Sequence, residues 1–305
     1  MLRKLILITL LIGLLAACSP QVTEPAADAT LTFTDGLGRE VMLNGPAQRV
    51  VSLAPSNTEI LFAIGAGDQM VGRDQLSDFP PEAAVVTDIG TTFDTLNTEA
   101  IVSLQPDLVL AAEINTPEQV KQLEDLGLTV YYLKNPLTLE EMYANLETVA
   151  QLTGHAEEAA ALIESLKRRV AAVDEKIAPL SSRFSVFYEL DATDPAKPYT
   201  AGKGTFITQL IDRAGGINIA SELEGYPQMS LEQVVAADPD FIILGDARYG
   251  VSPESIAQRP GWQNLSAVQN GQVLPFNDDL VSRPGPRLVD ALEELAKLMR
   301  PGLFE

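Results

Sequence analysis

The chain has few of the side chains that support metal or nucleophilic chemistry, since its 305 residues include one cysteine and one histidine. The histidine, His155, stands among glutamates at the start of a predicted helix, which indicates a surface residue. A catalytic triad centred on histidine and a metal site with several histidines are therefore excluded. With no cysteine after Cys18, the fold needs no disulfide and has no cysteine ligands for a metal cluster.

Motifs for phosphate binding and acyl transfer are also missing. The stretch Gly202-Lys203-Gly204-Thr205 is glycine-rich but does not have the spacing of a P-loop. No Gly-x-Ser-x-Gly nucleophile elbow and no Gly-x-Gly-x-x-Gly dinucleotide fingerprint occurs. The sequence therefore predicts neither an enzyme nor a resident cofactor or metal.

Positive charge is scarce. The chain has 21 basic against 42 acidic residues and a formal net charge of −21. Nucleic acids are polyanions that bind proteins largely through lysine and arginine, so a nucleic-acid partner is excluded.

A long apolar run occurs once, at the start of the chain. Arg3 and Lys4 precede the apolar run Leu5 to Leu15, and Leu15-Ala16-Ala17-Cys18 follows. The pattern is typical of an export signal, and its apolar part is too short for a spanning helix of about 20 residues. Cys18 stands where a bacterial lipoprotein signal is cut and acylated. We therefore expect an extracytoplasmic protein that is held at a membrane by a lipid on Cys18.

One pattern of helix and strand occurs twice, at 96–110 and at 229–244. Each copy begins with a helix-capping residue, Asn97 or Ser230, and has a glutamate two residues later, Glu99 or Glu232. A short helix, Pro-Asp and four apolar residues follow, which predicts a helix leading into a buried strand. The duplication predicts two similar α/β lobes. The glutamates fit ordinary helix-end chemistry, and they fit equally a matched pair of docking points.

Strand and helix patterns alternate along the rest of the chain and predict two mainly parallel sheets covered by helices. Met70-Val71-Gly72 and Val85-Val86 are among the expected strands. The chain reads as helix from Leu139 to Ile177 with a break at Gly154. The part after this break, a helix of about 23 residues, would span about 35 Å from one lobe to the other. The predicted fold is α/β, with two Rossmann-like lobes joined by a single long rigid helix. The expected segments are a signal peptide 1–18, a flexible tether 19–30, an N-terminal lobe 31–137, a helical segment 138–178 and a C-terminal lobe 179–305.

Four aromatic residues stand in polar loops near the predicted strand ends. Phe79 and Phe93 belong to the first lobe, and Tyr199 and Tyr226 to the second. Any one of them could simply pack its own loop. Because the carboxyl ends of parallel strands face the crevice where ligands bind, two rings in each lobe predict a shared binding cleft.

These stretches resemble the periplasmic-type substrate-binding proteins of ABC importers for cobalamin, ferric siderophores and haem. The resemblance covers nearly all of the mature chain. It is carried by the stretches Arg49-Val50-Val51-Ser52-Leu53-Ala54-Pro55-Ser56-Asn57-Thr58-Glu59, Ser77-Asp78-Phe79-Pro80-Pro81, Pro106-Asp107-Leu108-Val109-Leu110 and Arg283-Pro284-Gly285-Pro286-Arg287. It implies a monomer with two slightly closing lobes, the class III architecture, whose partners are a small-molecule ligand and the importer's transmembrane subunits. Glu99 and Glu232 match the family glutamates that dock on arginines of those subunits.

Within the family, the cobalamin-binding members match best. Their corrin-contacting rings align with Phe79, Phe93, Tyr199 and Tyr226, and their acid before the last helix aligns with Asp279. The resemblance thus implies a corrinoid stacked on these rings, with Asp279 and Arg283 bonding its peripheral groups. No ring type is conserved, so a ferric siderophore or haem is the alternative ligand. An anionic siderophore would need cations in the cleft, for which Arg73, Arg248 and Arg283 are available.

Two hypotheses of other classes have less support. A surface hydrolase on a similar two-lobed frame would need a nucleophile and a base, and the sequence shows neither motif. An assembly protein resembling the nitrogenase cofactor subunits would need cysteine ligands that this chain lacks.

Overall fold

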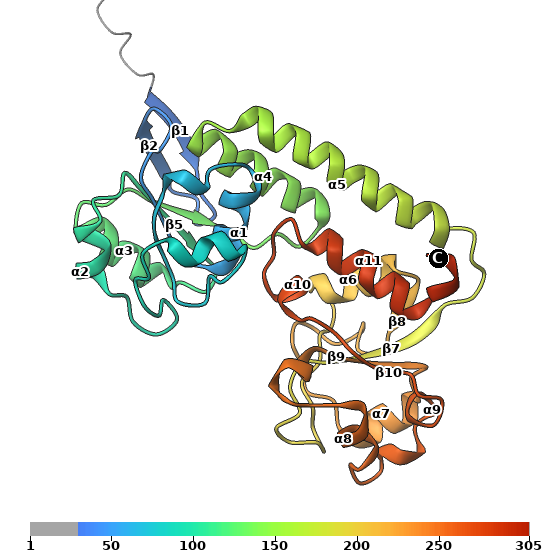
Figure 1. The fold of residues 1–305 in the computed structure, drawn as a ribbon. Coiled ribbons are helices and arrows are strands. Elements are labelled where there is room, and N and C mark those ends of the chain that lie inside the picture. Colours follow the sequence, from blue (N-terminus) through green and yellow to red (C-terminus); the bar gives the residue numbers. More distant parts are fainter. Residues whose placement is uncertain (1–29, 305) are drawn as a thin grey trace, which may run out of the picture.

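The computed structural model describes residues 30–304, which form two α/β lobes (Figure 1). The expected signal segment, Cys18 and the tether up to residue 29 lie outside the described residues. Thr30, expected to end the tether, is already the first residue of a strand. No helix in 30–304 is both long enough and apolar enough to cross a bilayer.

Lobe 1 contains a parallel sheet in the order β4-β3-β5-β6. Its strands are β3 (Val50–Ser52), β4 (Met70–Arg73), β5 (Leu108–Ala112) and β6 (Val130–Leu133). An antiparallel hairpin of β1 (Thr30–Thr34) and β2 (Glu40–Asn44) precedes it. The hairpin turn joins the edge strand β6, because the Gly36 N–H donates to the Tyr132 carbonyl at 2.8 Å. Its helices are α1 (Pro55–Ala63), α2 (Thr98–Ser103), α3 (Pro117–Asp125) and α4 (Leu139–Thr153), with the 3₁₀ turns η1 (Gly67–Gln69) and η2 (Pro81–Val85).

Lobe 2 repeats this topology with the parallel order β10-β9-β7-β8. In both sheets the second strand pairs on one side of the first strand, the third pairs on the other side, and the fourth lies beyond the third. The strands are β7 (Phe184–Glu189), β8 (Gly216–Asn218), β9 (Phe241–Leu244) and β10 (Val273–Pro275). The helices are α6 (Phe206–Arg213), α7 (Leu231–Ala237), α8 (Pro253–Ala257), α9 (Ser266–Gln269), α10 (Asp279–Ser282) and α11 (Leu288–Met299), with η3 (Gly245–Tyr249), η4 (Trp262–Asn264) and η5 (Pro301–Leu303). The duplication expected from the sequence is present in the strand order.

The two copied units agree in backbone detail. Asn97 caps α2 by accepting from the Ala100 N–H at 3.1 Å, and Ser230 caps α7 by accepting from the Gln233 N–H at 3.3 Å. The residue before each proline, Gln105 or Asp238, has a positive φ of 48° or 40°. Each helix therefore ends with a left-handed residue that turns the chain directly into the buried strand β5 or β9.

The expected strand at Val85-Val86 is wrong. Val85 ends the 3₁₀ turn η2 and its side chain is 90% exposed. Two adjacent β-branched residues favour a strand, but here they follow Pro80-Pro81, whose fixed φ and missing N–H groups suit a tight turn and not a ladder.

Three apolar cores hold residues 30–304 together. One face of each sheet packs into a shared core that runs through both lobes and includes Leu110, Leu146, Val170, Ile243 and Leu292. The opposite faces form a separate core in each lobe, closed in lobe 1 by α2 and α3 and in lobe 2 by α7, η4 and α9. Alternate residues of a strand enter different cores, as the period of two in a strand requires.

The helix α5 (Ala156–Ile177) lies along the shared core and contacts elements of both lobes (Figure 1). It packs on α4 of lobe 1 and on α11 of lobe 2, and Arg169 pairs with Glu293 of α11 at 2.7 Å. Its 22 residues span about 33 Å. The helix α4 packs on α1 inside lobe 1. Of the helical segment expected at 138–178, only α5 therefore runs between the lobes.

Candidate ligand-binding cleft

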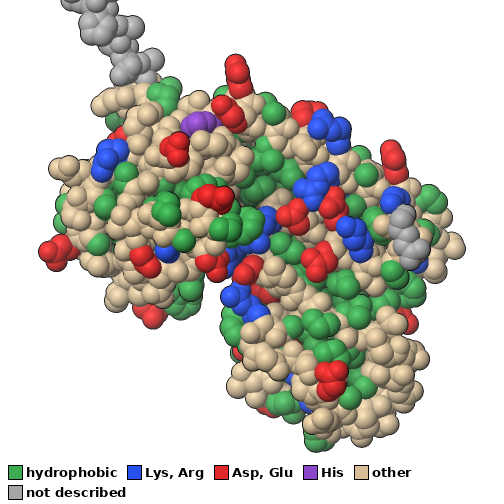
Figure 2. Space-filling view, in the orientation of Figure 1, with side chains coloured by type: hydrophobic (Ala, Val, Ile, Leu, Met, Phe, Trp, Pro, Cys, Tyr) green, Lys and Arg blue, Asp and Glu red, His purple; other side chains and the backbone are tan. Residues whose placement is uncertain are grey.

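The two lobes enclose a notch that is visible in the space-filling view (Figure 2). At its base lies a hollow of about 290 Å³, which we call the interlobe cleft. Lobe 1 contributes Ala54, Pro55, Ser56, Ala112 and Ile114, and lobe 2 contributes Arg248, Tyr249, Asp279, Arg283 and Pro284. A hollow walled by both lobes is the form of site that binds small molecules between domains.

The cleft lies where parallel α/β sheets bind ligands. In each sheet the second strand lies on one side of the first strand, and the third strand lies on the other side. The carboxyl ends of the first and third strands therefore flank a topological switch point. In lobe 1, Ala54 follows β3 and Ile114 follows β5, and both line the cleft. In lobe 2, Leu190 follows β7 and Asp246 follows β9, and both line a second hollow of about 360 Å³. Tyr249 lines both hollows, which therefore adjoin.

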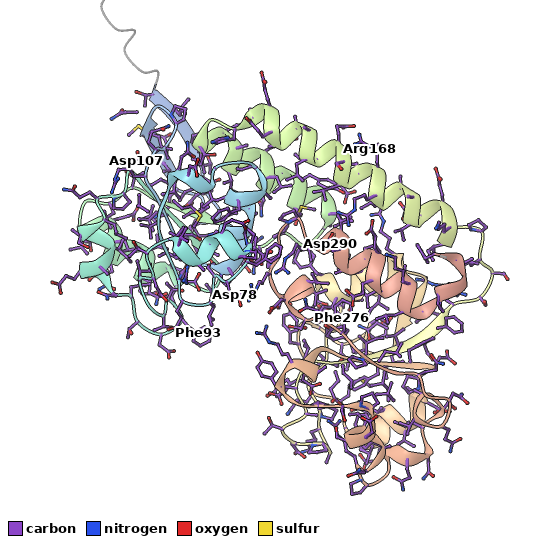
Figure 3. The ribbon with its side chains drawn as sticks, viewed as in Figure 1. Asp78, Phe93, Asp107, Arg168, Phe276 and Asp290 are labelled. Atoms are coloured by element: carbon purple, nitrogen blue, oxygen red, sulfur yellow. The ribbon has the colours of Figure 1, made fainter. Side chains whose placement is uncertain are left out.

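Arg283 joins the lobes across the floor of the cleft. Its Nη1 donates to Asp78 at 2.6 Å and to Glu59 at 3.3 Å, both in lobe 1. Arg287 also donates to Glu59, through Nε at 2.7 Å. Burial raises the pKa of Glu59 although both guanidinium groups oppose this. For the more exposed Asp78, burial is outweighed by Arg283, which holds the pKa of this carboxyl below its ordinary value. Figure 3 shows Asp78 on the side of lobe 1 that faces lobe 2.

Asp279 is at the cleft, as the resemblance implies, and it is already bound to arginine. Its Oδ1 pairs with Nη1 of Arg248 and lies 3.4 Å from Nη2 of Arg283. Arg73 is not at the cleft: it donates to the carbonyls of Ala83 and Asp74 at 2.9 Å. Every arginine that lines the described cleft thus has an acidic partner within the protein.

Tyr226 lies in the loop of lobe 2 that precedes α7. Its ring is 60% exposed, and burial together with the carboxylates of Asp278 in lobe 2 and Glu113 in lobe 1 raises the pKa of its hydroxyl. Tyr199 is on the neighbouring segment, because the Thr200 N–H donates to the Pro227 carbonyl at 2.9 Å. The backbone of Tyr199 pairs with Leu190 directly after β7, so both tyrosines are at the carboxyl edge of the lobe-2 sheet.

The loop of Phe93 is fixed at the switch point of lobe 1. Its neighbour Thr92 donates to the Leu53 carbonyl at 2.8 Å, and Asn115 donates to the Thr92 carbonyl at 3.2 Å. Phe93 itself is 63% exposed and lies at the edge of lobe 1 that borders the notch (Figure 3). The role of this ring in ligand contact stays a prediction.

Phe79 lies at the junction of the lobes but in a different hollow. The guanidinium of Arg287 lies 4.0 Å from its ring centroid, which is a cation–π contact. The surrounding hollow of about 460 Å³ is lined by Phe62, Ala63 and Pro286 and does not include the cleft residues of either lobe. Phe79, like Phe93, Tyr199 and Tyr226, is therefore not among the residues that line the interlobe cleft or the second hollow.

Tyr249, which lines both hollows, and Asp191, which lines the second hollow, were not singled out by the sequence. Tyr249 is 79% exposed and lies 5.5 Å from the guanidinium of Arg248. Asp191 lines the second hollow. A usable signal was available, because both follow strands of the second lobe within a few residues, where carboxyl-end loops gather.

Behind the second hollow lies a buried charged cluster. Arg259 donates to both carboxylate oxygens of Glu189, at 2.6 and 2.9 Å. Asp246, 4% exposed, adds a second acid to this single cation. Burial and the neighbouring carboxylate of Glu189 raise the pKa of Asp246 to about 7.

Glu99 and Glu232 are exposed in the first turns of α2 and α7 and occupy matched positions. Neither has an ion-pair partner among residues 30–304. Backbone N–H groups at the helix start lower the pKa of Glu232. No group of histidine, cysteine and acidic side chains in the same range could hold a metal ion.

Comparisons with known proteins agree on one kind of protein. A family model described as "Periplasmic binding protein" matches residues 50–280. An uncharacterized ABC transporter substrate-binding lipoprotein, YvrC, from Bacillus subtilis is 34% identical over 280 residues, which cover 90% of this chain and 87% of that protein.

Two solved structures share the fold. The periplasmic vitamin B12 binding protein BtuF of Vibrio cholerae is 31% identical, with a TM-score of 0.71 and coverage of 85% of this chain and 99% of that one. The periplasmic heme-binding protein RhuT from Roseiflexus sp. RS-1 is 28% identical, with a TM-score of 0.74 and coverage of 84% and 99%.

Proposed function

The chain belongs to the periplasmic binding protein family, and on that basis we propose that it binds cobalamin or a related corrinoid between its lobes. It is an extracytoplasmic substrate-binding protein of an ABC importer and not an enzyme. The chemistry of the cleft distinguishes among the ligands of this class.

The observation that carries the corrinoid proposal is the position of Tyr226. Its side chain is exposed at the carboxyl edge of the lobe-2 sheet, on a segment that pairs with the segment of Tyr199. Flat apolar rings around a cleft suit a planar macrocycle, which gains dispersion and apolar burial by stacking on them. The relative whose name includes vitamin B12 shares this fold at 31% identity. Stacking on Tyr199, Tyr226 and Phe93, with Phe79 nearby, is the binding mode that we propose.

Haem is the second candidate because one neighbour in fold is a heme-binding protein. Haem iron needs an axial ligand such as histidine or tyrosinate. His155 precedes α5 and packs beside Gly65, away from the cleft residues. The raised pKa of Tyr226 opposes formation of a tyrosinate. An anionic siderophore would need free arginines, but Arg248 and Arg283 are paired with acids of the protein. The paired arginines favour the corrinoid over an anionic siderophore, and the raised pKa of Tyr226 disfavours this tyrosine as a haem ligand.

The test is calorimetric titration of the purified protein with cyanocobalamin, haemin and a ferric hydroxamate. We expect submicromolar affinity for cyanocobalamin alone. Tyr226→Ala should weaken binding by about tenfold, because a stacked ring contributes roughly 1–2 kcal/mol. Leu126→Ala, an exposed apolar side chain on the far edge of lobe 1, is the matched control and should bind as the wild type does. Binding of haemin or of the hydroxamate without cyanocobalamin would establish the alternative.

Delivery would use the two ends of the molecule and its anchor. We propose that Glu99 and Glu232 dock on arginines of the importer's transmembrane subunits, and that a lipid on Cys18 keeps the receptor near them. The docking proposal is supported by the matched positions of the two glutamates in the duplicated units. The lipid proposal is supported by the sequence around Cys18.

A further inference from the structure

The duplicated unit repeats more on the protein surface than its glutamate. In α2, Glu99 is followed three residues later by Val102. In α7, Glu232 is followed at the same distance by Val235. Residues three apart share one face of a helix, with Cβ atoms about 5–6 Å apart. The two valines are exposed to nearly the same degree, 40% and 43%. We call each glutamate together with its valine a Glu–Val patch.

One buried residue in each helix turns the Glu–Val patches outward. Ile101 and Val234, each directly before the valine of its patch, are fully buried in the cores on the sheet faces opposite the shared core. Figure 1 shows α2 and α7 on the outer sides of the two lobes, away from α5. Neither valine lines the interlobe cleft or the second hollow, so a ligand held there does not cover the patches.

The fold of neither lobe explains the two valines. Valine is a poorer helix former than alanine or leucine, and an exposed valine adds little to the core of its own lobe. Three matched positions are exposed in both helices, and the copies agree at the glutamate and at the valine. At the third position Ser103 of α2 corresponds to Ala236 of α7. A pair of side chains that both lobes display alike on their outer surfaces indicates a contact outside the protein.

Exposed glutamates by themselves are a weak basis for docking. Ion pairs between exposed groups contribute little to affinity, and charge complementarity acts mainly on specificity and on the rate of association. An apolar side chain beside the carboxylate buries its own surface on contact and keeps water away from the ion pair, which strengthens the pair. The valine of each patch has the position that this role requires.

We propose that Val102 and Val235 pack on apolar side chains of the importer's transmembrane subunits, each beside the cation that the neighbouring glutamate binds. The partner is the membrane part of an ABC importer because the chain belongs to the family of its binding proteins. This inference rests on the docking of Glu99 and Glu232 proposed above and is independent of the ligand in the cleft. Because both lobes present the same patch, the partner offers two similar surfaces.

The experiment measures the affinity of the full chain, in detergent, for the importer's transmembrane subunits held on a sensor surface. Val102→Ala with Val235→Ala should weaken binding about tenfold, because each change removes about half of an exposed valine's apolar surface. This factor should be the same at low and at high salt, since an apolar contact is not screened. Glu99→Gln with Glu232→Gln should weaken binding at low salt and have a smaller effect at high salt.

Two measurements separate docking from stability. The melting temperature of the double valine variant should equal or exceed that of the wild type, because alanine favours a helix more than valine does. Val85→Ala with Ile217→Ala is the matched control. It shortens one exposed aliphatic side chain in each lobe outside the patches, and this variant should dock as the wild type does.

Three results would overturn the inference in different ways. Wild-type affinity in the double valine variant, with weaker binding in the double glutamate variant, would remove the apolar contact and leave the glutamates as docking residues. Wild-type affinity in both variants would also remove docking at α2 and α7, while the corrinoid proposal would stand. Loss of self-association of the chain in the double valine variant, with unchanged affinity for the transmembrane subunits, would place a second copy of the chain on the patches.

Discussion

At the scale of single residues, the least ordinary group is the Asp246 carboxyl. It shares a buried region with Glu189 and the single cation Arg259. Burial and the Glu189 charge raise its pKa from 3.8 to about 7. Between these values the folded chain binds a proton that the unfolded chain releases. Stability therefore falls as the pH rises from about 4 to about 7, and the full cost is present above pH 7.

This loss of stability with rising pH gives a prediction for Asp246→Asn. The amide can donate to Glu189 as the protonated acid does, and it carries no charge at any pH. We expect the variant to melt a few degrees above the wild type at pH 8, about 4 °C, and at the same temperature at pH 5. Thermal denaturation at the two pH values measures this, with Asp125→Asn on the surface of α3 as the control. A difference of equal size at both pH values would show that Asp246 does not take up the proton.

The sequence alone could not show which arginines are free to bind a ligand and which are paired with acids of the protein. Arg248 and Arg283 were available in the sequence as binding cations, and both are paired at the cleft. The lobe-1 partners of Arg283 are Glu59 and Asp78, more than 200 residues away in the sequence. Pairing across such separations depends on how two lobes meet, which no local pattern records.

At the scale of elements, the duplicated unit is the feature that the sequence predicts best. Caps at Asn97 and Ser230, short helices and buried strands all follow from local patterns, since capping and hydrophobic period act within a few residues. The strand expected at Val85-Val86 is wrong because the two preceding prolines outweigh the strand preference of a short β-branched pair.

The exposed glutamates on α2 and α7, Glu99 and Glu232, give a prediction at the scale of elements. Glu99→Arg combined with Glu232→Arg should abolish ligand uptake by cells, because each change replaces attraction to arginine by repulsion. Ligand affinity of the purified variant should stay as in the wild type, since neither residue lines a described hollow of the cleft. Uptake of radiolabelled cyanocobalamin and titration of the pure protein measure the two effects.

Glu118→Arg with Glu254→Arg is a matched control, because both acids also lie in first helical turns. This control pair should transport normally. Normal uptake by the Glu99 and Glu232 variant would return both residues to a helix-end role.

At the scale of the whole molecule, one apolar core passes through both lobes under α5. The lobes are also joined by the ion pairs of Glu59 with Arg283 and Arg287. A shared core and a buried ionic contact oppose large relative movement of the lobes. We therefore expect a single cooperative unfolding transition and little closure on ligand binding.

Glu59→Gln tests the ionic contact. The change leaves two buried guanidinium groups with a neutral partner, and removal of one member of such a cluster costs about 3 kcal/mol. We expect a clear fall in melting temperature and a wider distribution of distances between spin labels placed on α3 and α8. Glu118→Gln, on the surface of lobe 1, should change neither. An unaltered distance distribution in Glu59→Gln would mean that the shared core alone holds the lobes.

The sequence by itself determined the class of fold, the two lobes and their helical connection, and the loops that carry aromatic rings. These depend on hydrophobic period, capping and turn chemistry, which act over short distances along the chain. Only the tertiary structure decided that Arg283 is committed to Glu59 and Asp78 and that Phe79 packs on Arg287 in a hollow separate from the interlobe cleft. Those features arise where loops of two lobes meet, and the free energy of a charge there depends on neighbours that are distant in sequence.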